Sequence, residues 1–475
     1  MGVPSSFPTD SKFTPSLSTC PLYIGLSVIY NLTMSPNRKN SLIIFIIIAL
    51  SFTWSGAGYL ASLYHIMDIV SPEKANIVME VYDYLFQGLG LFGTIIYVRF
   101  KGTDHIRHLF ASGSMAWIIV FFTSLYTNNS PSAIAMDSIS AVLIGITTGI
   151  YLTLLATIKS NRGFLFGAGW ALATVASWLI SLAKDGVFLR SRLTVVPCAI
   201  LVAFSIISVY VFYVDVEENG EKESFERKYH PVYAGVFILL AGIVFSLGYL
   251  FDSSPVATGA VDLELSRCFY AVGLMLAGIV YDRSKRTGLL LCVCALICPF
   301  ASVLLTNYPG TTVALYIVNY VFRGFFTVYC VSTFVDYARV SGLFLAGAGL
   351  MFRRIGEPAG ALLGIAFDDN PVAITVLTSI FFAATIIAAA FVQTNTYDLS
   401  ASTDDDDKLA SFRKKYVLSS REEEVLNEVL KGSTNPQIAS TLFISENTVK
   451  FHIRNLLKKT ETSNRKELIA LFNDR

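Results

Sequence analysis

The chain has 475 residues, of which 53% are hydrophobic and only 15% are charged, and its mean hydropathy is +0.57. Ordinary soluble proteins of this length are far less apolar, so the composition places most of the chain in a lipid bilayer. The formal net charge of +1 excludes an overall basic character, and a nucleic-acid-binding segment must be sought locally.

The N-terminal residues 1–40 are predicted to be a cytoplasmic tail, because they lack the charged start, apolar block and cleavage site of a secretory signal. A second methionine, Met34, stands shortly before the first strongly apolar segment. The native start is therefore left open between Met1 and Met34.

Residues 41–393 are predicted to be a membrane domain with twelve spans, because a spanning helix needs about 20 predominantly apolar residues and twelve segments qualify. They are 41–65, 77–99, 107–126, 133–158, 163–183, 193–214, 231–251, 261–281, 288–306, 311–335, 341–367 and 371–393. The charged loop 215–230 divides them into halves at 41–214 and 231–393. Gly-Ala-Gly occurs at 167–169 and again at 347–349, as expected for two six-helix repeats.

Lys and Arg in the short loops define the orientation of these spans, because cytoplasmic loops carry an excess of both residues. The basic loop residues that fall on one side are Arg38, Lys39, Arg99, Lys101, Lys159, Arg162, Arg283, Lys285, Arg286 and Arg339. Lys184, Arg190 and Arg192 depart from the pattern. Both termini are therefore predicted to be cytoplasmic.

One basic loop carries a motif, Gly278-Ile-Val-Tyr-Asp282-Arg283-Ser-Lys285-Arg286. It resembles a loop motif of the major facilitator superfamily, which implies a similar twelve-helix fold and a conformational latch formed by Asp282 and Arg283 at the cytoplasmic face. The first-half copy, near Arg99 to Arg107, is degraded, and the later Gly of the motif is missing, so the motif bears more on the fold than on proton-coupled transport. The alternative is an ordinary loop whose charges only set orientation.

Ionisable residues within the spans are candidates for ligand binding, because such groups are expensive in a bilayer and usually face the bundle interior. The predicted ligand-binding residues are Asp83, Asp137, Arg267, Arg323, Arg353, Arg354 and Glu357, accompanied by Glu80 and Glu264. Arginines bind carboxylates bidentately, so the sequence favours a small anionic ligand. The alternative is internal pairing, of Glu264 with Arg267 and of Glu357 with Arg353 or Arg354, which are three or four residues apart.

Residues 394–414 form a polar, acidic linker, and residues 415–475 read as four short amphipathic helices. The first is expected to start at an N-cap, Ser419 or Ser420, and to end near Gly432. Asn435 is expected to cap the second helix, residues 436–442, the third covers residues 446–459, and the fourth begins at Asn464.

The third of these helices carries a basic stripe, because Lys450, Arg454 and Lys458 recur every four residues. Two helices joined by a tight turn can place the second helix in the major groove of DNA. The pattern therefore predicts a DNA-facing helix, whereas spacing alone is equally compatible with a solvated surface.

The C-terminal strings Leu418-Ser-Ser-Arg-Glu-Glu-Glu-Val-Leu426, Gly432-x-x-Asn435-x-x-Ile438-Ala439 and Leu442-Phe-Ile-Ser-Glu-Asn-Thr-Val-Lys-x-His452 resemble the LuxR family throughout. This resemblance implies that Lys450, Phe451 and Arg454 face base edges. It also implies phosphate contacts from Asn447, Thr448, Lys458 and Lys459, and pairing of the last helix with a second copy on double-stranded promoter DNA.

The sequence therefore predicts an all-α fold, a polytopic 12-helix membrane bundle of two repeats followed by a four-helix LuxR-type helix-turn-helix domain. We expect a one-component transcriptional regulator of the bacterial inner membrane that senses a small-molecule ligand. The alternatives are a secondary transporter with a regulatory DNA-binding domain, and a mere membrane anchor for constitutive DNA binding. No enzymatic motif, metal-ligand spacing or cofactor motif is recognisable, so no catalysis, metal or cofactor is expected.

Overall fold

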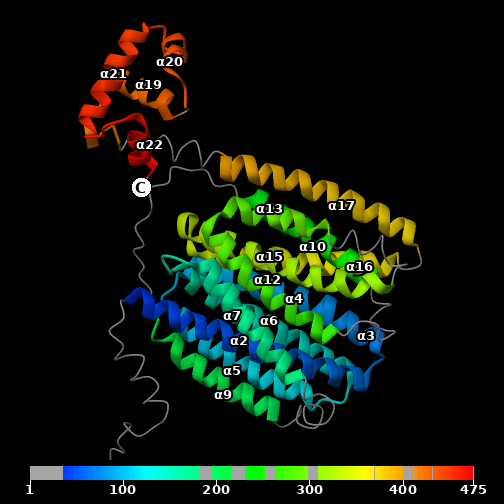
Figure 1. The fold of residues 1–475 in the computed structure, drawn as a ribbon. Coiled ribbons are helices and arrows are strands. Elements are labelled where there is room, and N and C mark those ends of the chain that lie inside the picture. The colour runs from blue at the N-terminus through cyan, green and yellow to red at the C-terminus, as the bar shows by residue number, and fades with distance from the viewer. Residues whose placement is uncertain are drawn as a thin grey trace, which may run out of the picture. The chain divides into compact units, whose positions relative to one another are not determined.

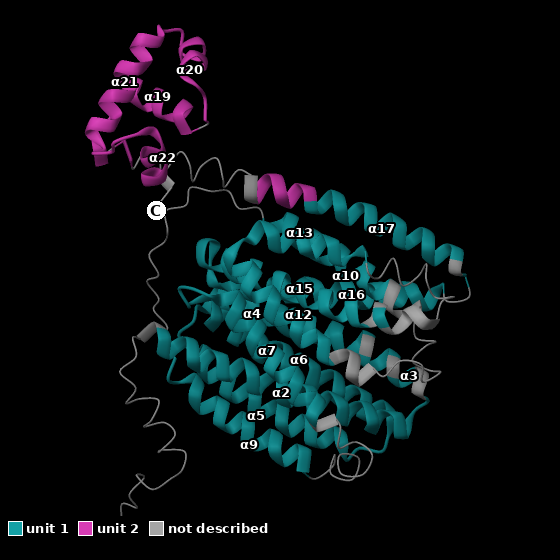
Figure 2. Cartoon of the chain, viewed as in Figure 1, with its two compact units in different colours: residues 1–389 teal, residues 390–475 magenta. Residues whose placement is uncertain are grey.

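The computed structural model describes residues 36–181, 195–214, 231–251, 263–297, 309–367, 370–398, 409, 412–413, 415–430 and 432–473. All regular elements in these ranges are helices, and none of the described residues forms a strand. The chain divides into two compact units, residues 1–389 and residues 390–475 (Figure 2).

The helices before the C-terminal domain follow the apolar segments in chain order (Figure 1). They are α2 (Pro36–Ile69), α3 (Pro72–Ile77), η2 (Val78–Tyr82), α4 (Asp83–Lys101), α5 (Ile106–Leu125), α6 (Ser130–Ala156), α7 (Arg162–Ser181), α9 (Val195–Val211), α10 (Pro231–Phe251), α12 (Leu263–Arg283), α13 (Lys285–Ala295), α15 (Pro309–Ser341), η4 (Leu343–Gly347), α16 (Ala348–Ala366), α17 (Pro371–Val392) and η5 (Gln393–Asp398). Each apolar segment expected from the sequence overlaps at least one of them. Five helical stretches in the described ranges are long and apolar enough to cross a membrane: Arg38–Ile69, Ile106–Leu125, Ser130–Ala156, Ile317–Ser341 and Val372–Thr396.

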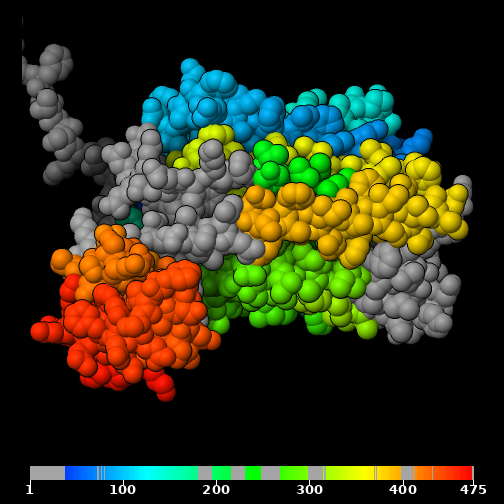
Figure 3. Space-filling view, turned by 90° about the horizontal axis from the view of Figure 1, so that it is seen from above, coloured from blue at the N-terminus to red at the C-terminus, as the bar shows by residue number. Residues whose placement is uncertain are grey.

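The outward faces of these helices are apolar as well as the inward ones. In α5, Trp117 and Phe121 are buried, whereas Ile119 on the same helix is 60% exposed. Helix α17 lies at the surface along its length (Figure 3), with Val372 and Ile387 exposed. A helix that is apolar on all sides must be covered by protein or by lipid, so these surfaces are compatible with a membrane protein.

The two halves of the first unit repeat the same helix pairings. In the first half α4 and α5 pack against α6, and α2 packs against α7. In the second half α12 and α13 pack against α15, and α10 packs against α16. Between the halves α7 contacts α12, and α4 contacts α16. The same three kinds of helix pairing therefore occur in both halves, in the same chain order.

Glycines allow close helix crossings in corresponding helix pairs of the two halves. A Cβ atom at Gly90 would lie 2.0 Å from the carbonyl oxygen of Val142, where α4 crosses α6. A Cβ atom at Gly273 would lie 1.9 Å from the carbonyl oxygen of Val321, where α12 crosses α15. Such contacts are typical of helix packing in membranes, where small residues let two backbones approach.

The C-terminal domain is built from α19 (Ser420–Leu430), α20 (Asn435–Thr441), α21 (Glu446–Lys459) and α22 (Arg465–Asn473). Its core draws apolar residues from all four helices, namely Val425, Leu426, Val429, Ile438, Ala439, Val449, Leu456, Leu468 and Phe472. Leu409 and Phe412, which the sequence placed in the linker, are buried in this core, and the ring centroids of Phe412 and Phe472 are 5.3 Å apart. The domain therefore has a hydrophobic core of its own.

Side-chain caps set where these short helices begin. Ser419 is the N-cap of α19, since its Oγ accepts from the Glu422 N–H while Glu422 accepts from the Ser419 N–H. The expected cap at Asn435 is wrong by one residue, because the Thr434 N–H donates to Gln437 and makes Thr434 the N-cap of α20. Gln437 is the residue that decides between two good capping side chains.

Candidate functional site

The turn between α20 and α21 fixes the direction of the helix with the basic stripe. Phe443 in this turn has a φ of 52°, and Ser445 caps α21 by accepting from the Thr448 N–H at 3.1 Å. Val449 and Leu456, which are fully buried, hold one side of α21 against the domain core. The opposite side of α21 must then face outward, because residues three or four apart share a face.

That outward side of α21 carries most of the residues predicted to contact DNA. Asn447, Lys450, Phe451, Arg454 and Lys458 are all exposed, and Phe451 is 57% exposed. Thr448 is half-buried beside the Ser445 cap. Among the described residues no hydrogen bond or ion pair engages the side chains of Lys450, Arg454 or Lys458. Their charges are therefore available to phosphates and base edges.

Lys459 differs from its neighbour Lys458. Its Nζ lies 2.7 Å from Oε2 of Glu422 and donates to the carbonyl oxygen of Val417 at 2.9 Å. Burial raises the pKa of Glu422, but hydrogen bonds from Lys459 and Ser419 outweigh burial and leave the pKa below its ordinary value. Lys459 thus ties the end of α21 to the start of α19, and its predicted phosphate contact draws no support from these contacts.

In the first unit, Asp282 at the end of α12 joins the two halves. Its Oδ1 accepts from the Gly163 N–H at 2.9 Å and its Oδ2 accepts from the Phe164 N–H at 2.7 Å, at the N-terminus of α7. These are backbone groups that a helix cannot satisfy internally. The side chain of Arg283 is exposed, and no contact of it is found among the described residues.

A second link between the halves, on Asp336 of α15, was missed by sequence reasoning. Arg162 donates to Oδ1 of Asp336 at 2.6 Å and 2.9 Å, and Lys285 lies 2.6 Å from Oδ2. The hydroxyl of Tyr281 also donates to Oδ2, at 3.1 Å. In the sequence Arg162 and Lys285 are only loop charges, and nothing local indicates that Asp336 lies between them.

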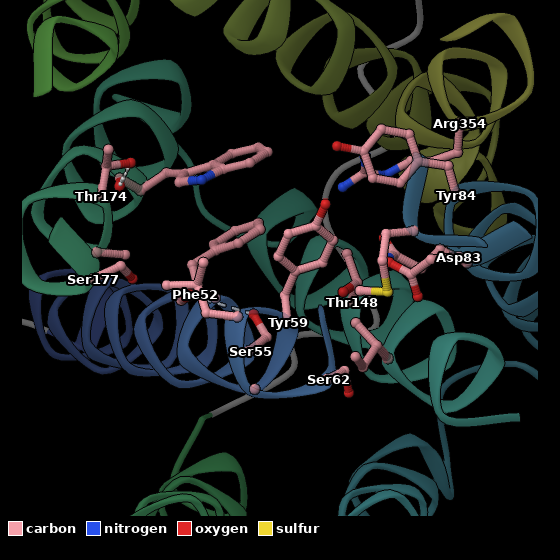
Figure 4. A pocket seen from close by; sticks show the side chains of 18 of the residues that line it. Phe52, Ser55, Tyr59, Ser62, Asp83, Tyr84, Thr148, Thr174, Ser177 and Arg354 are labelled. Atoms are coloured by element: carbon pink, nitrogen blue, oxygen red, sulfur yellow. Dashed lines mark hydrogen bonds between the residues drawn. The ribbon is translucent and has the colours of Figure 1, made fainter. Parts of the chain in front are cut away.

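A cavity of about 320 Å³ opens between the two halves of the first unit. It is lined by residues of α2, η2, α4, α5, α6 and α7 from the first half and of α12, α15 and α16 from the second. The predicted ligand-binding residues that line it are Asp83, Asp137, Arg323, Arg353 and Arg354. The side chains of Arg267, Glu80 and Glu264 lie outside the described part of the chain. Residues distant in sequence thus meet at one cavity (Figure 4).

Glu357 does not line the cavity but binds its arginines. Oε1 accepts from Arg323 at 3.1 Å and from Arg353 at 3.0 Å. The Arg354 guanidinium is 3.7 Å from Oε2, too far for a hydrogen bond, and lies over the ring of Tyr84 at 4.1 Å. Internal pairing therefore accounts for Arg323 and Arg353 better than for Arg354.

Comparison with known proteins identifies the C-terminal domain. Residues 416–472 match the family described as bacterial regulatory proteins, luxR family. The CsgBAC operon transcriptional regulatory protein of Escherichia coli is 48% identical over 58 residues, which are 12% of this chain and 27% of that protein. The nitrate/nitrite response regulator protein NarP of Escherichia coli is 54% identical over 56 residues, 12% of this chain and 26% of that protein. The uncharacterized transcriptional regulatory protein YhcZ of Bacillus subtilis is 51% identical over 59 residues, 12% of this chain and 27% of that protein.

The chain thus matches only about a quarter of the length of these curated relatives. The C-terminal domain is a LuxR-type helix-turn-helix domain, and the proteins that share it are transcriptional regulators rather than enzymes. The matched residues include the whole of α19, α20 and α21.

Proposed function

We propose that the chain is a membrane-bound one-component transcriptional regulator, in which a twelve-span bundle senses a small ligand and the C-terminal domain binds promoter DNA. The observation that carries this proposal is the outward side of α21, where Lys450, Arg454 and Lys458 are exposed without protein partners in the described chain. Their spacing along a LuxR-type domain suits the major groove and its flanking phosphates.

Within this interface, each residue has a distinct part. Lys450, Phe451 and Arg454 contact base edges, and Lys458 contacts a phosphate. Asn447 and Thr448, at the N-terminus of α21, contact phosphates where the helix dipole favours an anion. Lys459 holds the domain together through Glu422. Pairing of α22 with a second copy makes the DNA-bound form a homodimer, which suits a two-fold symmetric operator.

The membrane unit belongs in the bacterial inner membrane, with both termini in the cytoplasm and a bundle similar to the major facilitator superfamily. The repeated helix pairings and the exposed apolar faces support this arrangement. Asp282 of α12 accepts from two N–H groups at the N-terminus of α7 and acts as a latch between the halves, with Arg283 beside it at the cytoplasmic face.

The ligand binds in the cavity between the halves. A ligand shifts a conformational equilibrium only as far as it binds one state better than the other. A cavity lined by both halves meets this condition, since any rocking of one half against the other changes its shape. The change then alters how the tethered domains reach or pair on DNA.

The test uses the full-length protein in lipid nanodiscs, incubated with fragmented genomic DNA of its host. We expect enrichment of a small set of fragments, lost in the double variant Lys450→Ala with Arg454→Ala and kept in Lys101→Ala, a change of an exposed charge on α4. Equal enrichment by wild type and double variant would contradict the proposal.

A second candidate, a secondary transporter with a regulatory DNA-binding domain, is favoured by one observation. The cavity lies between halves that Asp282 and Asp336 link, as alternating access requires. Substrate uptake into vesicles, driven by an ion gradient, separates it from a receptor that binds without transport. A plain anchor predicts no promoter response to any compound.

A further inference from the structure

Charges of opposite sign from the two halves of the bundle meet at one end of the cavity. Arg354 on α16 lies over the ring of Tyr84, which directly follows Asp83 on α4. Figure 4 shows Arg354, Tyr84 and Asp83 on one side of the view, with Phe52 and Ser177 on the other. The backbones are also close, because a Cβ atom at Gly88 of α4 would lie 3.5 Å from the Cβ of Arg354.

Of the three arginines that line the cavity, Arg354 is the one left to bind a ligand. Arg353 donates to Glu357 and Thr327, and Arg323 donates to Glu357. Arg354 is 12% exposed, its Nε has no hydrogen-bond partner, and its distance to Glu357 is 3.7 Å. A buried guanidinium with unused donors, set in a fork, suits a carboxylate.

The charges around the cavity argue against a plain anion as the ligand. The charged side chains described at this site are three arginines and three carboxylates, namely Arg323, Arg353, Arg354, Asp83, Asp137 and Glu357. An anion alone would leave one unbalanced negative charge in a site of low dielectric, which is costly. A zwitterion keeps the balance and gives both Arg354 and the carboxylates of the first half an opposite charge.

The other end of the cavity is aromatic. Phe52 and Trp170 stack with ring centroids 4.0 Å apart, and Tyr270 meets Trp170 edge-on at 6.0 Å. All three line the cavity, together with the hydroxyl groups of Thr174 and Ser177. Aromatic walls with a few polar groups favour a flat, aromatic ligand body.

We propose that the cavity binds an aromatic α-amino acid. Its carboxylate is held by Arg354, its ammonium group by Asp83, and its ring lies toward Phe52 and Trp170. An α-amino acid carries its carboxylate and ammonium groups on the same carbon. Its head group is therefore compact enough to contact Arg354 on α16 and Asp83 on α4 at the same time. The ligand thereby bridges the two halves and stabilises the arrangement in which Arg354 and Asp83 are near each other.

This assignment rests on the proposed sensing function for its biological meaning, but its test does not depend on DNA. Binding to the full-length wild-type protein in nanodiscs is measured calorimetrically for phenylalanine, tyrosine and tryptophan. Three analogues of phenylalanine each remove one feature: phenylpropanoate lacks the ammonium group, phenethylamine lacks the carboxylate, and cyclohexylalanine lacks the aromatic ring. We expect at least one of the three amino acids to bind. If phenylalanine binds, we also expect phenylpropanoate and phenethylamine to bind at least about 30-fold more weakly, because a buried charge then loses its partner. Cyclohexylalanine should bind about 3- to 10-fold more weakly, because it loses only the aromatic stacking.

Two variants probe the head group. Arg354→Gln and Asp83→Asn should each weaken binding by at least about 30-fold, while Lys101→Gln, an exposed charge on α4, should leave binding unchanged. Arg354→Lys, which keeps the charge but loses the fork, tests the carboxylate contact if Arg354→Gln does not fold.

Binding of phenylpropanoate as tight as that of phenylalanine, or no binding of any of the three amino acids, would overturn the inference. Failure of ligand binding together with promoter occupancy that depends on Lys450 and Arg454 would leave the regulator intact. Amino-acid binding without any promoter occupancy would instead leave the ligand site intact and refute the regulator.

Discussion

The same substitution at two adjacent lysines at the end of α21 should have different effects: at Lys459 it should lower the stability of the domain, and at Lys458 it should weaken DNA binding. Lys459 donates to Glu422 at 2.7 Å and to the carbonyl oxygen of Val417 at 2.9 Å, whereas Lys458 is exposed and makes no hydrogen bond or ion pair with any described residue. Methionine keeps the length of either side chain and removes only its charge. Any difference between Lys458→Met and Lys459→Met therefore reports what each ammonium group contacts.

The magnitude follows from the burial of Glu422, which is 4% exposed. A hydrogen bond to a charged group stabilises a protein by about 1.5–3 kcal/mol. The Lys459 side chain is 38% exposed, so solvent screening reduces the expected loss in Lys459→Met to about 1–2 kcal/mol. Lys458→Met should change the free energy of unfolding by less than about 0.5 kcal/mol.

The assay is urea denaturation of residues 405–475, the domain with its own core, combined with DNA binding across a salt series. Lys458→Met should make the plot of log affinity against log salt shallower, reducing the magnitude of its negative slope by about one, as the loss of a phosphate contact does. Lys459→Met should leave that slope unchanged. The double variant Lys459→Met with Glu422→Gln, compared with the two single variants, should show a coupling of about 1–2 kcal/mol in the free energy of unfolding.

Equal loss of stability in the two methionine variants would refute this reasoning. So would a salt slope that falls by about one in Lys459→Met, because Lys459 would then reach a phosphate as the sequence resemblance implies.

Three further outcomes follow from other contacts. The lowered pKa of Glu422 means that its stabilising contribution is present above its ordinary value of 4.5 and lost as the pH falls below it; urea titrations from pH 7 to 3 should show this loss, and Glu422→Gln should flatten it. Asp282→Ala removes the acceptor for two N–H groups of α7 and should lower the stability of the solubilised protein by about 0.5–2 kcal/mol, read as thermal midpoint against Arg283→Ala. Gly273→Ala should abolish the folded peak in size-exclusion chromatography, whereas Gly93→Ala, with open space around it, should retain that peak.

The helices could be predicted from the sequence because apolarity and helix caps are local properties. The expected third helix of the C-terminal domain, residues 446–459, has the bounds of α21. The cap of α20 was misassigned because Thr434 and Asn435 are both good caps, and only the reach of Gln437 selects Thr434.

The contacts between distant residues could not be predicted in the same way. Periodicity placed Lys459 on the basic side of a helix, but its partner Glu422 lies 37 residues earlier. Asp336 and Arg162 are separated by 174 residues, and no local pattern pairs them. In the sequence each of these charged residues is indistinguishable from a surface or loop residue, because its partner is brought close only by the packing of the helices.

The ligand expectation changed for the same reason. Arginines within spans suggested an anionic ligand, and the acidic residues Asp83 and Asp137 lay on other helices. The fold brings those acidic residues to the same cavity as Arg354. The sequence of α16 alone suggests a positively charged site, whereas the folded cavity contains both positive and negative side chains.

The measurement that tests the regulator most directly is genome-wide footprinting of the native, membrane-bound protein. Wild type is compared with the double variant Lys450→Ala and Arg454→Ala, with Lys101→Ala as control. We expect discrete promoter sites that vanish in the double variant and persist in the control. Absence of discrete sites under every growth condition would contradict the account and favour a transporter whose C-terminal domain does not bind promoters.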